Sequence, residues 1–309
     1  MLLRDAAFIL FAIILMFVTI KKMISIPFSI IIFAIILVIS QYDRVYQSWV
    51  NMKEQESFER RMGELVKTIN ENESTVIETI PRIIIQVWVQ KDGGKPMIPG
   101  NQIQYMNKFR KLNPSFEHMF FDGNDIEVFF KDNYLEYYDT YMNLPFFIQK
   151  LDFFRYVAIY HYGGFYFDMD VEPFKPLDES ILNHSAVFPV DEYANAVDCQ
   201  NPRMNSYCLV GQNFLLGQYA FGATAKHPFM KFVADKIKQN KDNYVRIADK
   251  VVKQNKDSVH YFVYKTTGPD FVTDCYVNYP NKEQLYILSN GKRQVFGDYA
   301  AHRYIGTWK

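Results

Sequence analysis

The sequence predicts an α/β domain that follows an apolar, membrane-anchoring N-terminal segment. Two features predict the domain: runs typical of strands alternate with runs typical of helices from residue 80 onward, and 49% of the 309 residues are hydrophobic, enough for a sizeable core. A third predicts the anchor, since residues 2–40 are almost entirely apolar.

The charge and cysteine content exclude several classes of protein. Thirty-four Lys and Arg residues balance 34 Asp and Glu residues, so no overall basic field exists to hold nucleic acid. The three cysteines, Cys199, Cys208 and Cys275, fit neither a dense disulfide scaffold nor a CxxC metal site. A bridge between Cys199 and Cys208 and a pair of free core thiols both remain open.

Residues 1–45 are expected to form a membrane anchor of one or two transmembrane helices. The stretch MISIPFSIIIFAIILVIS, residues 23–40, is about 27 Å long as a helix, close to the hydrocarbon thickness of a bilayer. Residues 6–20 are also apolar but short for a span, and could cross a thin bilayer or lie beside the second helix.

The lysine pair Lys21-Lys22 predicts the orientation of this anchor. Lysines next to a membrane segment tend to stay cytoplasmic, so residues after 40 should lie on the lumenal side of the Golgi or endoplasmic reticulum. The topology is then type II-like or two-span. An anchored cytosolic domain is the alternative, and a cleaved signal peptide fits poorly because no small-x-small site follows the run.

Residues 46–78 are expected to form a helical stem before a soluble domain at residues 79–309. The segment is rich in charge and lacks proline. Its apolar residues recur at roughly helical spacing: Val50, Phe58, Met62, Leu65 and Ile69.

The first elements of the domain alternate between strand and helix. IPRIIIQVWV (80–89) predicts a buried strand, IQYMNKFRKLNP (103–114) a helix that stops at its proline, and FEHMFFD (116–122) a second strand. A helix should follow, capped by Asn124 or Asp125.

The central block combines a helix with a strand that carries acidic residues. Residues 145–164 follow a helical period and stop at two glycines. FYFDMDVEPF (165–174) is then expected to be a strand, with Asp168 and Asp170 near its carboxyl end. Ligands of open α/β sheets bind outside that end of the strands.

Asp168 and Asp170 point to a metal site. Alternate residues of a strand face one side, so the two carboxylates could reach a common point. Their mutual repulsion favours a bound cation, and hard oxygen ligands suit Mn²⁺ or Mg²⁺. The nearby Glu172 and the preceding glycines strengthen this interpretation, in which the metal holds a diphosphate.

FDMD is also similar to the nucleophile strand of haloacid-dehalogenase-type phosphatases, in which the first aspartate is phosphorylated. That family places the motif near the start of its domain and follows it with Gly-Thr or Thr-Val. Here Val171-Glu172-Pro173 follow, in the middle of the domain, so this reading is the weaker alternative.

Six blocks, in order, resemble the DXD-motif glycosyltransferases of family 32, which include the yeast initiating α-1,6-mannosyltransferase and inositol-phosphoceramide mannosyltransferases. The blocks are IPRIIIQVWV, LNPSFEHMFFD, IQKLDFFRYVAIYHYGGFYFDMDVEPFKPLD, FGATAKHPFM, YKTTGPDFVT and HRYIGTWK. The resemblance implies a GT-A type, Rossmann-like nucleotide-sugar-binding domain and retaining, metal-dependent transfer of a hexose.

The same resemblance assigns roles to residues around the two aspartates. Trp88 would line the pocket of the donor's base, and Asp152 and Arg155 would hold the donor's sugar hydroxyls and phosphate. Asp168 would contact ribose and sugar, and Asp170 would ligate the metal. Asp168, Asp170 and Arg155 are thus the candidate catalytic residues.

Later blocks complete the expected donor site. His302 and Trp308 belong to a terminal segment that closes over diphosphate and metal in related enzymes, and His302 is a second candidate metal ligand. The asparagine usual before FGATAKHPFM is replaced by Gln218, a donor-binding candidate. The histidine usual in the first strand is Ile85, which leaves the choice of donor sugar open.

Several partners follow from these roles. The expected donor is a GDP- or UDP-hexose, with GDP-mannose first, and the expected acceptor is a glycan or glycolipid at a membrane. Residues 188–212 are expected to form an acceptor-side loop, with Asp191 and Glu192 in reserve roles. A membrane-tethered sugar-binding protein with an inactive transferase fold is the non-enzyme alternative.

Overall fold

The computed structural model describes residues 28–70, 79–90, 94, 96–254 and 256–305. By its internal contacts the chain divides into two units, Met1–Ser57 and Phe58–Lys309. The long helix α2 (Phe28–Asn70) contributes residues to both.

The expected anchor is only partly within the described residues. Residues 6–20 and 23–27 lie outside them. Within the described segments, no helix has both the length and the apolar character needed to cross a bilayer.

The second unit is built on a mixed sheet, which confirms the α/β prediction. Its strands are β1 (Ile83–Val87), β2 (Glu117–Phe121), β3 (Gly164–Phe167), β5 (Ala186–Tyr193), β6 (Phe214–Leu216), β7 (Ala220–Ala223) and β8 (Tyr286–Leu288). The order is β2-β1-β3-β7-β5-β6, and β8 pairs with β5. β1 is parallel to β2 and β3, so these three strands direct their carboxyl ends to one edge.

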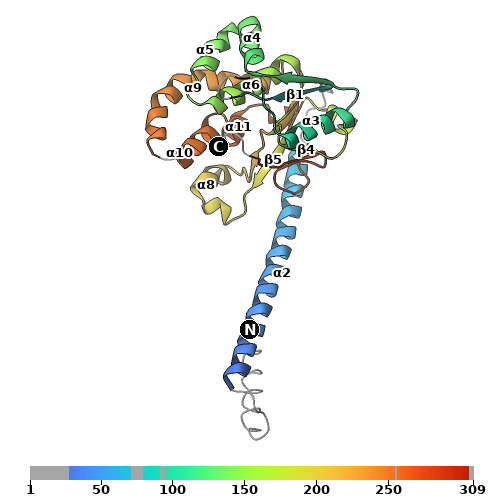
Figure 1. Cartoon of the computed structure of the whole chain (residues 1–309), viewed down its shortest axis with the longest axis vertical. Coiled ribbons are helices and arrows are strands. Elements are labelled where there is room, and N and C mark those ends of the chain that lie inside the picture. Colours follow the sequence, from blue (N-terminus) through green and yellow to red (C-terminus); the bar gives the residue numbers. More distant parts are fainter. Residues whose placement is uncertain (1–27, 71–78, 91–93, 95, 255, 306–309) are drawn as a thin grey trace. The chain divides into compact units, whose positions relative to one another are not determined.

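Helices cover both faces of the sheet (Figure 1). The helices described after α2 are α3 (Gly100–Leu112), α4 (Gly123–Asn133), α5 (Leu135–Asn143), α6 (Phe147–Tyr162), α7 (Glu179–Leu182), α8 (Pro202–Leu209), α9 (Pro228–Val252), α10 (Lys256–Thr266) and α11 (Pro269–Asn278). On β3, Tyr166 packs into the core under α6 and α9, whereas Phe165 and Phe167 pack into the core that holds Phe109 of α3. This alternation follows from the pleat of the strand.

The two glycines before β3 allow the chain to turn sharply from α6 into the sheet. Gly163 and Gly164 adopt φ angles of 69° and 86°. A Cβ atom on Gly164 would lie 2.5 Å from the carbonyl oxygen of Ile83, so only glycine fits against β1 here.

A second, three-stranded sheet lies next to the carboxyl end of β3. It consists of β4 (Val171–Pro173), β10 (Ala300–His302) and β9 (Val295–Phe296). β10 runs antiparallel to β4 and places His302 opposite Val171. The end of the chain therefore meets the segment that carries the two aspartates.

Three expectations for these elements were wrong. The cap of α4 is Asp122, whose carboxylate accepts hydrogen bonds from the N–H groups of Asn124 and Asp125. Residues 188–212 are not a loop, because they contain most of β5 and all of α8. A disulfide bond joins Cys199, which precedes α8, to Cys208, which lies within it. Residues 165–174 form two strands, β3 and β4, separated by a turn.

Candidate functional site

A pocket of about 370 Å³ opens at the carboxyl ends of β1 and β3. Its walls come from the segment after β1, from α3, α6, β5 and α8, and from the end of the chain. Seven of the eight residues predicted to form the site line it: Trp88, Asp152, Arg155, Asp168, Asp170, Gln218 and His302. The eighth, Trp308, lies outside the described residues.

The two aspartates converge because of a turn, not because of strand pleating. β3 ends at Phe167, and the N–H of Val171 donates to the carbonyl of Asp168 at 3.0 Å. The chain must turn here because Val171–Pro173 pair with β10 in the second sheet. The N–H of Asp168 donates to the carbonyl of Tyr219 at 2.7 Å, which fixes the start of the turn.

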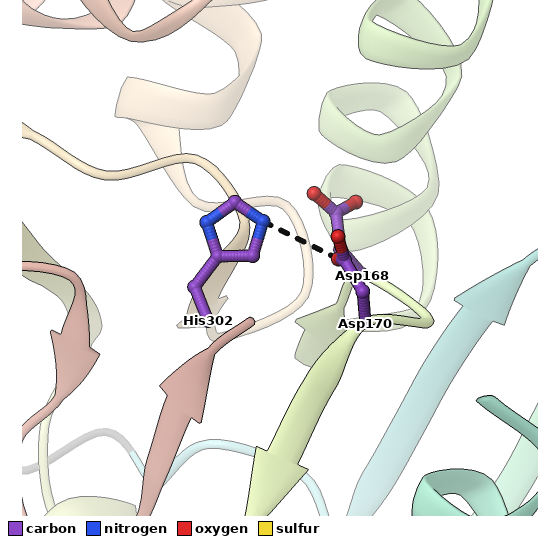
Figure 2. Close-up of side chains that lie close together, drawn as sticks. All are labelled: Asp168, Asp170 and His302. Carbon is purple, nitrogen blue, oxygen red and sulfur yellow. Dashed lines mark ion pairs between the residues drawn. The ribbon is translucent and has the colours of Figure 1, made fainter. Parts of the chain in front are cut away.

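Asp168, Asp170 and His302 form a set of three potential metal ligands (Figure 2). One ligand atom from each lies within 4.8 Å of the other two. The Nε2 atom of His302 lies 3.3 Å from Asp170 Oδ1. The two carboxylates are hard oxygen ligands of the kind that Mn²⁺ and Mg²⁺ take, and the imidazole adds a nitrogen ligand, so these residues can hold a divalent cation.

The pKa values of these groups reflect burial and their neighbours. Burial raises the pKa of Asp168, and Arg155 only partly offsets this. Burial acts the same way on Asp170, but the hydrogen bond and charge of His302 outweigh it, so the pKa of Asp170 is lowered. The pKa of His302 is raised, because the nearby carboxylates outweigh its burial.

Two aromatic rings hold the imidazole of His302. Its ring stacks on Tyr219, with centroids 4.7 Å apart and an interplanar angle of 15°. Tyr304 lies on it with a centroid distance of 4.0 Å. The ring therefore has little freedom to turn away from Asp170.

Arg155 connects the metal-ligand set to α6. Its guanidinium lies 3.0 Å from Asp152 and 3.1 Å from Asp168, and it also donates to the carbonyl of Gln218 at 3.1 Å. The group lies 4.7 Å from the ring centre of Tyr166. Its Nε atom has no hydrogen-bond partner among the described residues, although it is buried.

Asp152 is fully buried, and burial raises its pKa to about 6 although Arg155 lowers it. Its Oδ2 accepts a hydrogen bond of 2.7 Å from the hydroxyl of Thr267. Gln218 donates to its Oδ1 at 3.4 Å and accepts from the hydroxyl of Tyr156 at 2.7 Å. Gln218 thus belongs to the same buried network.

The wall formed by β5 and α8 carries a second charged group. Asp191 is buried, accepts a hydrogen bond of 3.3 Å from Tyr304, and has a pKa raised to about 6 by burial. Arg203 of α8 pairs with Glu192 at 3.2 Å and with the buried Asp270 at 2.6 Å. This places Asp191 and Glu192 at the pocket.

Sequence reasoning missed Arg203, Tyr219 and Tyr304. Arg203 stands in a segment without clear periodicity, so nothing in the pattern distinguished it from a surface arginine. Tyr219 follows a predicted site residue and Tyr304 lies two positions after another, so closeness in the chain was the signal that could have found them.

Comparisons with known proteins agree with this geometry. Residues 99–188 match the family model "Glycosyltransferase sugar-binding region containing DXD motif". This range includes both aspartates of the turn, together with Asp152 and Arg155.

Three curated relatives have recorded names that fit this match. Inositol phosphoceramide mannosyltransferase 1 of Schizosaccharomyces pombe is 28% identical over 160 residues, which cover 50% of this chain and 41% of that protein. A glycosyltransferase of Acanthamoeba polyphaga mimivirus, L373, is 29% identical over 218 residues, 65% of this chain and 82% of that protein. Initiation-specific alpha-1,6-mannosyltransferase of Candida albicans is 24% identical over 213 residues, 65% and 53%.

Among solved structures, PaToxG glycosyltransferase is similar with a TM-score of 0.43 and 15% identity, over 72% of this chain and 78% of that one. The chain spans about two fifths of the Schizosaccharomyces pombe relative and about half of the Candida albicans one. The matched region contains the Asp168-Met169-Asp170 motif, so residues 99–188 are similar to the sugar-binding region of DXD-motif glycosyltransferases, and the chain is similar in sequence to the fungal mannosyltransferases.

Proposed function

We propose that this protein transfers a hexose from a nucleotide diphosphate sugar to a hydroxyl of a glycan or glycolipid, with retention of anomeric configuration and with a divalent cation. The observation that carries the proposal is the meeting of Asp168, Asp170, His302 and Arg155 in one pocket. Two fungal relatives are named mannosyltransferases, so we propose mannose as the hexose, with GDP-mannose as the donor ahead of UDP-hexoses.

The cation would be held by Asp168, Asp170 and His302. When bound, Mn²⁺ or Mg²⁺ supplies Lewis-acid charge that stabilises the departing diphosphate. Tyr219 and Tyr304 keep the imidazole of His302 directed at this position. The N–H of Ile305 donates to Asp170 Oδ2 at 3.0 Å, which fixes the orientation of that carboxylate.

Arg155 supplies a fixed positive charge next to the cation site. Two carboxylates, a carbonyl and the Tyr166 ring hold its guanidinium, so little reorganisation is needed when negative charge develops on the leaving group. Asp152 both anchors Arg155 and presents a carboxylate to the sugar hydroxyls.

For retention we favour front-face attack, in which the leaving phosphate helps to deprotonate the acceptor hydroxyl. Asp191 and Glu192, on the β5 wall, are then placed to orient the acceptor. We assign the fold to the GT-A type. We also propose that the apolar N-terminal segment anchors the protein in a Golgi or endoplasmic reticulum membrane, with the catalytic unit lumenal, which would bring a glycolipid acceptor close.

Nucleotide release from a panel of GDP- and UDP-sugars tests the proposal on the full-length chain. With Mn²⁺, one donor should be turned over. EDTA, or Asp170→Asn, should lower the rate by about 100-fold or more, because the diphosphate then leaves without compensating charge.

Asp242→Asn serves as a control, because the Asp242 side chain is 93% exposed and outside the pocket. It should keep the wild-type rate. Release that persists in EDTA would contradict metal dependence. A folded protein that binds sugars but releases no nucleotide would favour the sugar-binding alternative.

A further inference from the structure

The pocket wall between β1 and α3 contains a buried amide without a protein partner. Gln102 lies in the first turn of α3, is 2% exposed and lines the pocket, whereas its neighbours Asn101, Ile103 and Gln104 are exposed. Within the described residues, the Oε1 atom of Gln102 has no hydrogen-bond donor. A buried polar atom without a partner is costly, so its presence in a pocket wall calls for a ligand.

Trp88 lines the same pocket and has a second such atom. It follows β1 directly, and its indole Nε1 is buried with no acceptor among the described residues. The backbone N–H of Trp88 donates to the carbonyl of Phe121 at 3.1 Å, so its main chain is fixed to β2. The wall therefore offers one free acceptor and one free donor on rigid elements.

This wall differs in chemistry from the rest of the pocket. The other walls of the pocket carry the charged groups of Arg155, Asp168, Asp170 and His302. Charged side chains are suited to bind a diphosphate and its cation. Gln102 and Trp88 are uncharged, and an amide with an aromatic ring suits the flat, hydrogen-bonding surface of a nucleoside.

We propose that Gln102 binds the nucleoside half of a nucleoside diphosphate, with its Oε1 accepting an N–H of the base or an O–H of the ribose. The inference rests on the proposed function and names a residue that contacts the nucleoside of the donor. Selection of the nucleotide then depends on α3 as well as on the segment after β1.

A purely structural role for Gln102 makes a different prediction. Gln86 of β1 also has a buried Nε2 atom without a partner among the described residues, so the amide of Gln102 could serve only the packing of α3 on the sheet. Loss of the amide would then lower stability and affect all ligands of the pocket alike.

Calorimetric titration of the full-length chain with Mn²⁺ separates the two roles. The probes are GDP, UDP, ADP, CDP and pyrophosphate, and the variant is Gln102→Leu, which removes the amide at similar size. For the nucleotide that wild type binds most tightly, the Kd should rise about 10-fold, as expected for one lost hydrogen bond in a buried site. The Kd for pyrophosphate should change less than about two-fold, because pyrophosphate lacks the nucleoside.

Gln104→Leu is the matched control, since Gln104 is exposed on the same helix, and it should leave every Kd unchanged. If Gln102→Leu does not fold, Gln102→Asn replaces it, because the shorter amide withdraws Oε1 while remaining polar. A loss confined to one base identifies a base contact, and a uniform loss across the four bases identifies a ribose contact; both support the proposal.

Equal loss for nucleotide and pyrophosphate, or no loss for either, overturns the assignment of Gln102. If wild type binds pyrophosphate but gains no affinity from any nucleoside, the nucleotide-sugar proposal itself fails. The two failures are therefore distinguishable in one set of titrations.

Discussion

At the scale of one residue, Asp191 is a buried carboxylate in the pocket that should lower the stability of the folded protein when it is charged. Its carboxylate is buried on the β5 wall, and burial raises its pKa to about 6 from an ordinary value of 3.8. The folded state therefore holds a proton between about pH 4 and 6 that the unfolded chain has already released. Stability should fall as pH rises through this window and then level off.

Asp191→Asn removes this titration and should stabilise the protein at neutral pH. At pH 4 the group is largely protonated in the folded state, so the Tm values should be similar. At pH 7.5 the variant should be more stable by about 3 kcal/mol, because it no longer carries a buried charge. Thermal unfolding at both pH values measures this.

Asp242→Asn, at an exposed position, should give no such pH-dependent difference. A variant that is less stable than wild type at pH 7.5 would show that the protein stabilises the Asp191 charge. In that case the charged carboxylate of Asp191 would contribute to the stability of the fold, and it would not be available to bind a ligand.

The sequence predicts part of the site at this scale. Asp152 and Arg155 are three residues apart on a helix, and Asp168 and Asp170 follow an apolar run, so helix and strand rules bring the four to one edge. His302 comes from the far end of the chain, and only a family resemblance placed it. The Tyr219 ring and Arg203 depend on tertiary packing that no local pattern encodes.

At the scale of elements, the segment after β10 is fastened to the turn that carries the aspartates. The N–H of Arg303 donates to the carbonyl of Asp170 at 2.9 Å, and the N–H of Ile305 donates to its carboxylate. The Arg303 guanidinium pairs with Glu172 of β4 at 2.6 Å, and Lys108 of α3 pairs with the same carboxylate at 3.0 Å. Glu172 thus links α3, β4 and the end of the chain.

Glu172→Gln should weaken cation binding, although Glu172 does not line the pocket. The lost ion pairs are partly exposed, so the change should be about 0.5 to 1 kcal/mol, which raises the Mn²⁺ concentration for half-maximal activity about three-fold. Nucleotide release against Mn²⁺ concentration measures it. Glu179→Gln removes a different surface pair, with Arg82, and should leave the curve in place. Identical curves for all three proteins would mean that the link does not orient Asp170.

Element prediction succeeded where periodicity was strong and failed where tertiary pairing decided. The helix α6 and the strands β1 and β2 follow from apolar patterns and glycine or proline stops. Residues 165–174 read as one strand, because only the pairing of β4 with β10 forces the turn at Asp168–Asp170. Residues 188–212 read as a loop, although β5 lies deep in the sheet and α8 is held by a disulfide bond.

At the scale of the whole molecule, the unit that contains the pocket begins before the sheet does. Residues 58–70 of α2 belong to this unit. Phe58 is 6% exposed and meets the ring of Tyr193 edge-on at 6.1 Å, and Val66 is 3% exposed. The side chain of Asn70 both accepts from and donates to the backbone of Ile287 at 2.9 Å, which pairs it with β8 as a strand would.

Two truncations decide whether this helical end is part of the catalytic unit. A chain of residues 58–309 keeps these contacts, whereas a chain of residues 79–309, the boundary expected from the sequence, loses them. Two buried apolar side chains and two hydrogen bonds together contribute about 5 kcal/mol. The Tm of the shorter chain should then be about 10 to 20 °C lower.

In residues 58–309, Phe58→Ala should reproduce part of the loss, whereas exposed Lys67→Ala should not. Equal Tm values for the two truncations would show that the sheet is stable without α2, and that β5 does not need the contact between Phe58 and Tyr193.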